Sequence, residues 1–233
     1  MKVAIMQPYI FPYIGYFQLI HAVDTFVFLD DVNYIKKGWI NRNRILVNNT
    51  ESMFTIPVKK ASQNKLINEI ELMLDSNWIN QFYKTLEQNY SKAPNFNNTF
   101  SLIQSIFNSQ FNTISDLAIT SVKQICLSLG MEKNFQISSE LYNETKGQEK
   151  SDRLINIAKQ CKCNHYINPE GGKTLYHKDY FQLSGVALSF IENELLPYKQ
   201  FNDSFVGGLS IIDVFMFNTK ENVIDLLTQY QLN

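Results

Sequence analysis

Two short apolar segments near the N-terminus constrain the fold most strongly. "KVAIMQP" (residues 2–8) and "DTFVFLDD" (residues 24–31) are rich in β-forming residues and end in proline or polar residues. Between them, apolar residues recur with helical spacing from Phe17 to Val23. A strand, a helix and a strand in this order predict a βαβ unit with parallel strands and a right-handed crossover. Because ligands bind beyond the carboxyl ends of such strands, the loops after residues 8 and 31 are the first candidates for a site.

The rest of the chain alternates between helical and strand patterns. "FTIPVKK" and "INEIELML" predict further strands, and "SNWINQFYKTLEQNYSKAPNF" predicts a helix with Ser76 as its N-cap. Helical pattern continues to Gly130, a C-cap signal, and strand pattern returns near residues 165–191. We therefore expect one domain, residues 1–233, made of an α/β core (about 1–75), a helical block (76–130) and the remainder of the core with closing helices (131–233).

Composition excludes several classes of protein. A formal net charge of −1 argues against non-specific electrostatic binding of nucleic acid. No apolar run approaches the roughly 20 residues of a membrane span, and no signal-peptide pattern opens the chain, so we expect a cytoplasmic protein. Three cysteines without CxxC spacing and three scattered histidines give little support for a metal site. We therefore predict no metal and no cofactor.

The loop "DDVNYIKKGWINRNRI" after the second strand is the richest in chemistry. Asp30 and Asp31 can act as a base, bind a metal, or orient a ribose or an amine. The loop also supplies cations and amides for phosphate or an oxyanion and aromatic rings for stacking. These candidate binding residues are Tyr34, Lys36, Lys37, Trp39, Asn41, Arg42 and Asn43, with Arg44 beside them. The alternative is a solvated charged hairpin, in which exposed ion pairs contribute little.

The loop "QPYIFPYIGY" after the first strand is unusually bulky. Its candidate ligand contacts are Gln7, Pro8, Tyr13, Gly15 and Tyr16. The glycine lets the following helix start close to a sheet or a ligand, and a helix N-terminus can receive an anion. The alternative is hydrophobic cover with a backbone fixed by prolines.

A third candidate region joins "KSDRL" with "YINPEGGKTLY". Ser151 predicts a helix cap before Arg153, and the amides of Glu170, Gly171 and Gly172 can meet substrate oxygens or simply form a turn. We include Tyr176, which closes the second motif, as a candidate binding residue.

"GGLSIIDVFMF" predicts one of two closing helices. Ser210 at the N-cap and Asp213 three residues later are typical of a capping-box variant. In the alternative, Asp213 reaches the edge of the sheet.

Seven segments, taken in order, resemble the successive motifs of the WbqC-like proteins. They are "MQPYIFPYIGYFQLI", "VDTFVFLDDVNYIKKGWINRNRI", "YSKAPNF", "KSDRLINIAKQ", "HYINPEGGKTLY", "LPYKQF" and "LSIIDVFMFN". That family occurs in bacterial surface-polysaccharide gene clusters. The resemblance implies work on an amino sugar of O-antigen or capsule, such as transfer of a glycyl group to a sugar amine.

A more distant resemblance is to the nucleotidyltransferase-like α/β fold. Its His-x-Gly-His signature follows the first strand, where this chain has Tyr13 and Tyr16. The resemblance implies a parallel Rossmann-like sheet of nucleotidyltransferase type with a mainly helical insertion or appended block. Tyrosine carries no positive charge at neutral pH, so the substitution disfavours adenylyl transfer.

Our leading hypothesis is an acyl- or aminoacyltransferase acting on a nucleotide-linked amino sugar. In this hypothesis Asp30 or Asp31 acts as the general base. Because no serine or cysteine is placed as a nucleophile, we expect direct transfer from an activated acyl donor or carrier protein. The alternatives are nucleotide-dependent activation and a non-catalytic sugar-binding partner of a biosynthetic complex.

Overall fold

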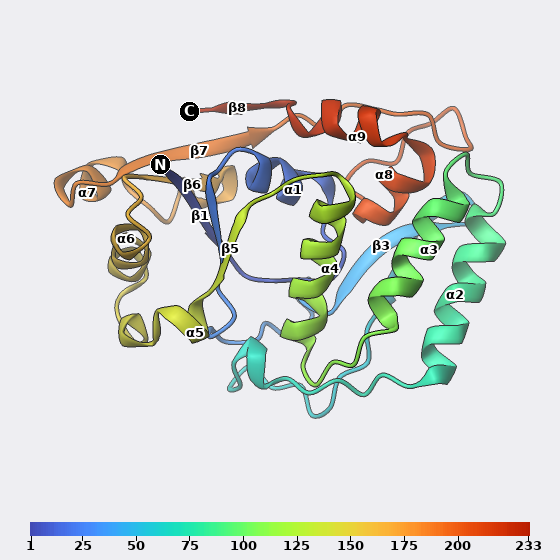
Figure 1. Cartoon of the computed structure of the whole chain (residues 1–233), viewed down its shortest axis with the longest axis horizontal. Coiled ribbons are helices and arrows are strands. Elements are labelled where there is room, and N and C mark those ends of the chain that lie inside the picture. Colours follow the sequence, from blue (N-terminus) through green and yellow to red (C-terminus); the bar gives the residue numbers. More distant parts are fainter.

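A six-stranded, mostly parallel sheet forms the centre of the computed structural model, which describes all 233 residues (Figure 1). Its first five strands are parallel and β8 is antiparallel to β7. In spatial order the strands are β5 (Asn134–Ile137), β2 (Thr25–Phe28), β1 (Lys2–Met6), β6 (His165–Pro169), β7 (Ala187–Asn193) and β8 (Tyr230–Leu232). The expected α/β class is confirmed. From β1 the chain first adds β2 and β5 on one side of β1 and later adds β6 and β7 on its other side. The topological switch point of the sheet therefore lies between β1 and β6.

Side chains alternate between the two faces of the sheet along each strand, and each face packs into its own hydrophobic core. Ala4, Phe26 and Phe28 belong to a cluster of 44 buried residues, whereas Val3 and Val27 point into a cluster of 14. The larger core is covered by α1 (Ile14–His21), α4 (Ile114–Ser128), α8 (Ile211–Phe217) and α9 (Lys220–Leu227), and the smaller one by α6 (Lys150–Gln160) and α7 (Lys178–Leu183). Burial of each large apolar side chain contributes about 1.5–3 kcal/mol.

The predicted βαβ unit is confirmed. β1 and β2 pair in parallel, with Val3 opposite Thr25, and α1 connects them. All residues of α1 except its last are buried, which explains why its sequence is apolar on nearly every side.

The helical block consists of α2 (Ser76–Tyr90), α3 (Phe96–Phe107) and α4. Figure 1 shows α2 and α3 at the opposite end of the molecule from α6 and α7. The N-cap of α2 is Asp75, whose carboxylate accepts a hydrogen bond from the Trp78 amide, so the prediction of Ser76 was wrong by one residue. Gly130 has a φ of +74° just after α4, as expected of a C-cap glycine.

A two-stranded antiparallel hairpin, β3 (Arg42–Val47) and β4 (Thr50–Thr55), stands apart from the main sheet. The expectation of a loop through residue 45 was therefore wrong over its last residues. Ile45 and Leu46 are buried, and the connecting Asn48 and Asn49 both have positive φ, as a tight hairpin turn requires.

Residues 67–74 were expected to form a strand and do not. They contain the short 3-10 helix η1 (Ile67–Glu69), and their remaining pairing is limited to single bridges. The carboxylate of Glu69 accepts a hydrogen bond from the Leu66 amide, which favours this turn over an extended ladder. "FTIPVKK" is likewise strand only up to Thr55.

The C-terminal half contains α5 (Ser138–Leu141), η2 (Asn143–Thr145) and η3 (Glu170–Gly172) beside the elements above. Helix α6 begins at Lys150 with Glu149 as N-cap and no side-chain cap, so the Ser151 cap was a wrong prediction. The Ser210 cap of α8 is confirmed, because its hydroxyl accepts a hydrogen bond from the Ile212 amide. β8 was not expected. No helix combines the length and the apolar character needed to cross a membrane.

Candidate active site

Two polar regions carry the candidate chemistry, and they share no residue. We call the first the carboxylate cluster; it consists of Asp30, Asp31, Asn68, Ser138, Ser139, Thr145 and Arg153. We call the second the aromatic cleft; it is lined by Tyr9, Tyr13, Trp39, Asn43, Arg44, Leu195 and Gly208.

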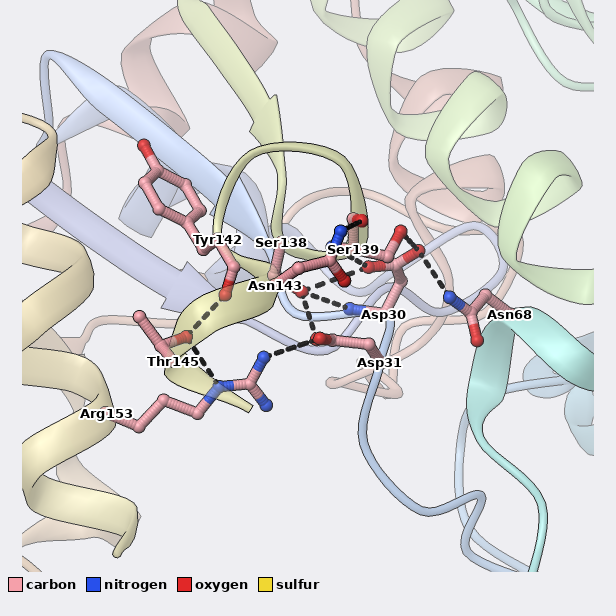
Figure 2. Close-up of polar contacts among 9 residues, drawn as sticks. All are labelled: Asp30, Asp31, Asn68, Ser138, Ser139, Tyr142, Asn143, Thr145 and Arg153. Atoms are coloured by element: carbon pink, nitrogen blue, oxygen red, sulfur yellow. Dashed lines mark hydrogen bonds and ion pairs between the residues drawn. The ribbon is translucent and has the colours of Figure 1, made fainter. Parts of the chain in front are cut away.

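Asp31 forms a buried ion pair with Arg153, which reaches it from the first turn of α6 (Figure 2). Nη2 of Arg153 lies 2.7 Å and 2.6 Å from the two carboxylate oxygens. The side chains are only 9% and 1% exposed. Nε of Arg153 donates to the Thr145 hydroxyl at 3.2 Å, which fixes the guanidinium from a second side. The charge of Asp31 is therefore neutralised inside the protein.

Asp30 has no cationic partner and is held by hydrogen bonds alone. The Ser139 amide donates to Oδ1 at 3.0 Å and the Ser139 hydroxyl to Oδ2 at 2.7 Å. The amide group of Asn68 donates to Oδ2 at a longer 3.3 Å. The Ser138 hydroxyl lies within hydrogen-bond distance of both Asp30 and Asp31 and accepts from the Asp30 amide.

The sheet explains why these residues meet. Asp30 and Asp31 follow β2, and Ser138 follows β5, which is the parallel neighbour of β2. Carboxyl ends of adjacent parallel strands share one edge, so residues more than 100 positions apart become neighbours. Both aspartates are only 3% exposed, so a substrate group reaches Asp30 only by displacing a present partner. The amide of Asn68 is the weakest of these partners, because its contact is the longest and its own Oδ1 is buried without a partner.

The aromatic cleft is an open hollow of about 310 Å³. Tyr9 and Tyr13 come from the loop after β1, Trp39 from the loop after β2, and Leu195 from the segment after β7, while Arg44 lies in the hairpin strand β3. Three loops at the carboxyl edge therefore contribute to it, as expected for an α/β ligand site.

Two guanidinium groups lie over the Trp39 indole. Cζ of Arg44 is 5.1 Å and Cζ of Arg42 is 5.8 Å from the ring, both within cation–π distance. Arg44 also pairs with Glu51 at 2.9 Å and donates to the Gly208 carbonyl at 3.0 Å, while its Nε is buried without a partner. Trp39 remains 45% exposed. The cleft thus presents an exposed ring beside fixed positive charge.

The tyrosines of the first loop have different environments. Tyr13 packs over Gly15, where a Cβ would lie 2.4 Å from the Tyr13 ring, so the glycine is required for the ring's position. The Tyr13 hydroxyl donates to Asn193 at 3.3 Å, at the end of β7. Tyr16 is buried and donates to the Gln7 carbonyl at 3.1 Å, which leaves its hydroxyl turned away from the cleft. Burial raises the pKa of both Tyr13 and Tyr16, so each is a neutral donor.

Several expected binding residues have structural partners instead of an open site. The Tyr34 hydroxyl donates to the Asn41 side chain at 2.7 Å, and Asn41 donates to the Ile56 carbonyl, so this buried pair joins the loop to the hairpin. Asn43 lines the cleft but uses its amide to hold the carbonyls of Ile10 and Phe11.

The third expected region does not join the cleft. Glu170 and Lys173 form an exposed ion pair at 2.7 Å in the turn after β6. Gly172 lies against Asn168, with no room for a Cβ, whereas Gly171 has open space around it. Tyr176 packs edge-on against Phe181 in the smaller core. Pro8 is buried, and Lys36 and Lys37 are exposed on the loop before Trp39.

The structure also adds residues that sequence patterns did not single out for the site. In the cleft these are Tyr9, Leu195 and Gly208, and in the cluster Asn68, Ser138, Ser139 and Thr145. The serine pair directly after the strand pattern "NFQI" was an available signal, because it marks the same sheet edge as Asp30. Nowhere do three His, Cys, Asp or Glu side chains gather in an arrangement that can hold a metal ion.

Comparison with known proteins gives a family match over nearly the whole chain. The WbqC-like protein family matches residues 7–225. The chain is also similar to "Uncharacterized protein Rv1507c" of Mycobacterium tuberculosis (strain ATCC 25618 / H37Rv), at 30% identity over 97% of both chains. No solved structure matches it.

Proposed function

Because the chain belongs to the WbqC-like protein family, we propose that it is a cytoplasmic transferase of surface-polysaccharide biosynthesis. In this proposal it transfers an acyl or aminoacyl group, such as glycyl, to the amine of a nucleotide-linked amino sugar. The observation that carries the proposal is the aromatic cleft, where an exposed indole lies beside two arginines at the carboxyl edge of the sheet.

The cleft suits a ligand that combines a ring with an anion. Trp39 and Tyr13 offer faces for a sugar or base, and stacking on such rings is favourable without requiring one specific ring. Arg42 and Arg44 offer positive charge to a diphosphate, and the unpartnered Nε of Arg44 is a donor still to be satisfied. A neutral or cationic sugar without phosphate would use only half of these groups.

The carboxylate cluster supplies the proton acceptor in this proposal. Transfer to an amine requires a base for the sugar ammonium and stabilisation of a tetrahedral oxyanion. Asp30 is the better of the two candidates, because Asp31 is neutralised by Arg153. Asp31 and Arg153 then act as positioning residues that hold the Ser138 hydroxyl against Asp30. Displacement of the Asn68 contact opens Asp30 to the substrate.

Titration calorimetry with a nucleotide-linked amino sugar tests the cleft. Trp39→Ala and Arg44→Gln should each raise the Kd about tenfold or more, given the size of cation–π and charge-assisted contacts. Tyr180→Ala is the matched control, because Tyr180 is similarly exposed, at 47%, but lies on α7. Unchanged affinity in both cleft variants would remove the main support for the proposal.

Turnover tests the base. Candidate acyl donors are supplied with the nucleotide sugar, and amide formation is followed by mass spectrometry. Asp30→Asn should abolish transfer while leaving sugar binding within about twofold of the parent chain, because a general base contributes roughly 10²–10⁴-fold to rate. Full turnover in the combined Asp30→Asn and Asp31→Asn variant would contradict the assignment.

A second candidate is a non-catalytic sugar-binding partner of a biosynthetic complex. In the carboxylate cluster each oxygen of Asp30 and Asp31 already accepts a hydrogen bond from another residue of the protein. This favours a non-catalytic role, because neither carboxylate has a free oxygen to accept a proton from a substrate. Sugar binding without amide formation from any donor would support this candidate. Nucleotidyl transfer gains no comparable support, since the Tyr16 hydroxyl already donates to a backbone carbonyl.

A further inference from the structure

Positive charge is strongly segregated in this chain. Residues 32–66 contain seven lysines and arginines and a single carboxylate, Glu51, a net charge of +6, whereas the whole chain carries −1. The remaining residues hold 14 cations against 21 acids, a net charge of −7. Such asymmetry points to an anionic partner for one face of the molecule.

The fold brings the two ends of this segment together. The Tyr34 amide donates to the Lys65 carbonyl at 2.9 Å, and Asn33 forms an isolated bridge with Leu66. Lys65, which closes a turn through a hydrogen bond from its amide to the Ser62 carbonyl, therefore lies beside the chain that leads to Lys36 and Lys37. Two of the seven cations are ion-paired, Arg44 with Glu51 and Lys59 with Glu71. The other five have no ionic partner, and we call them the basic face: Lys36, Lys37, Arg42, Lys60 and Lys65.

The basic face meets the aromatic cleft at Arg42, whose Cζ is 5.8 Å from the Trp39 ring, and exposed apolar groups lie in the same segment. Trp39, Asn43 and Arg44 line the cleft and belong to the same segment. Ile35 is 54% exposed beside Lys36, and Trp39 is 45% exposed. A partner seated here would meet positive charge around a small apolar centre, an arrangement typical of transient protein–protein contacts.

We infer that the basic face docks a small acidic carrier protein, which delivers the acyl or aminoacyl group to the cleft as a thioester on a phosphopantetheine arm. This inference rests on the proposed function and names its donor. The arm is long and thin, so it suits an open cleft at the edge of the face. Its phosphate would approach the arginines beside Trp39.

The transfer step balances without a further reactant. The sugar amine attacks the thioester carbonyl, an amide C–N bond forms and the C–S bond breaks. Asp30 accepts the proton of the amine and the departing thiolate takes it up as a thiol. The carrier leaves with a free thiol, ready for reloading.

Charge distribution favours a small acidic protein over a long polyanion. RNA would extend beyond the basic face and meet the rest of the chain, whose net charge is −7. A globular carrier touches only the face. The same argument disfavours an anionic membrane, since a flat surface brings neighbouring acidic regions close to the lipid phosphates.

Biolayer interferometry with the full chain and an unloaded holo acyl carrier protein tests the inference. Association should weaken several-fold between about 50 mM and about 200 mM salt, because the contact is electrostatic. Lys36→Glu combined with Lys37→Glu should weaken it about tenfold or more, mainly through the association rate. Both side chains are exposed, and melting temperatures check that the variant folds.

The control reverses two lysines elsewhere. Lys150→Glu with Lys178→Glu makes the same change of net charge at exposed first positions of α6 and α7, where negative charge favours a helix. Its affinity should stay within about twofold of the parent chain if the contact is local. Equal losses in the two variants would overturn the inference, because they would reflect total charge only.

Three further outcomes would also overturn it: no carrier binding at about 50 mM salt, tighter binding of mixed tRNA, or tighter binding of anionic vesicles. The docking inference and the proposed function fail separately. Carrier binding without transfer from a glycyl-loaded carrier contradicts the function alone. Transfer from a coenzyme A thioester without carrier binding contradicts the docking alone.

Discussion

Loss of the Arg153 charge is the most informative perturbation of the carboxylate cluster. Arg153→Met keeps most of the side-chain volume and leaves Asp31 buried without a cation. The remaining donor to Asp31 is the Ser138 hydroxyl, which is shared with Asp30. The variant therefore isolates the energetic effect of one buried charge.

The expected loss of stability is about 3–5 kcal/mol, as measured when one partner of a buried ion pair is removed. A Coulomb estimate agrees, because two unit charges about 4 Å apart at an effective dielectric of about 20 interact by roughly 4 kcal/mol. For a chain of this length, each kcal/mol lowers the Tm by about 2–4 °C, so the Tm should fall by about 6–20 °C. Asp31→Asn should be similarly costly, because it leaves the guanidinium buried with one good acceptor.

Urea unfolding followed by circular dichroism gives the free energies for a double-mutant cycle. The combined Asp31→Asn and Arg153→Met variant should lose less than the sum of the single variants, since neither charge is then left alone. Lys59→Met is the control, because Lys59 and Glu71 form an ion pair that is 55% and 58% exposed, and it should cost at most about 1 kcal/mol. A loss below about 1 kcal/mol for Arg153→Met would refute the argument that this pair is buried and coupled.

Three other predictions concern single positions. Gly208 has a φ of +69°, and a Cβ there would lie 3.3 Å from Nη2 of Arg44. Gly208→Ala should therefore lower the free energy of unfolding in urea by about 1 kcal/mol or more, and calorimetry should show weaker ligand binding at the cleft. Burial raises the pKa of Asp213, so its carboxyl group keeps its proton in the native state at pH values where the unfolded chain has lost it. The free energy of unfolding should therefore fall as pH rises from about 4 to the native pKa. Asp213→Asn should remove this pH dependence, as measured by unfolding between these pH values. Burial raises the pKa of the Cys126 thiol to about 12, so iodoacetamide should label Cys126 only after unfolding in urea, as read by mass spectrometry.

The sequence was sufficient where structure depends on local pattern. β1, α1 and β2 were predicted because their apolar residues recur with periods that distinguish strand from helix within thirty residues. Gly130 was predictable for the same reason, since a positive φ at a helix end favours glycine in any fold. The two aspartates were correctly expected at the end of β2, because polar residues follow a buried strand directly.

Features that depend on distant partners were not predictable. Asp213 has the position of a capping-box acid, but its carboxylate accepts hydrogen bonds from Tyr90, Tyr198 and Gln200. Tyr90 in turn accepts from the Leu46 amide, so one buried carboxylate joins α2, α8 and the hairpin. No local pattern encodes this, because each partner lies at least ten positions from Asp213 in sequence and only the packed core brings them together.

The strand β3 was missed for a related reason. "RNRILV" opens with charged and amide residues, which single-sequence patterns assign to loops. Arg42 and Arg44 point to one side, toward Trp39, while Asn43 points to the other and holds the carbonyls of Ile10 and Phe11. The alternation is that of a strand, but its buried face begins with the amide Asn43 before the apolar Ile45, because Asn43 satisfies the irregular loop after β1.

One linear stretch, residues 30–44, therefore contributes to two separate places. Its first two residues turn toward β5 and enter the carboxylate cluster, whereas Trp39, Asn43 and Arg44 near its other end line the cleft. If the proposed transfer is correct, the two ends should have separable effects on kinetics. Trp39→Ala should raise the Kd and KM with a smaller change in kcat, and Asp30→Asn should lower kcat at unchanged Kd. Equal loss of affinity in both variants would mean that the cluster supports the cleft structurally and takes no part in chemistry.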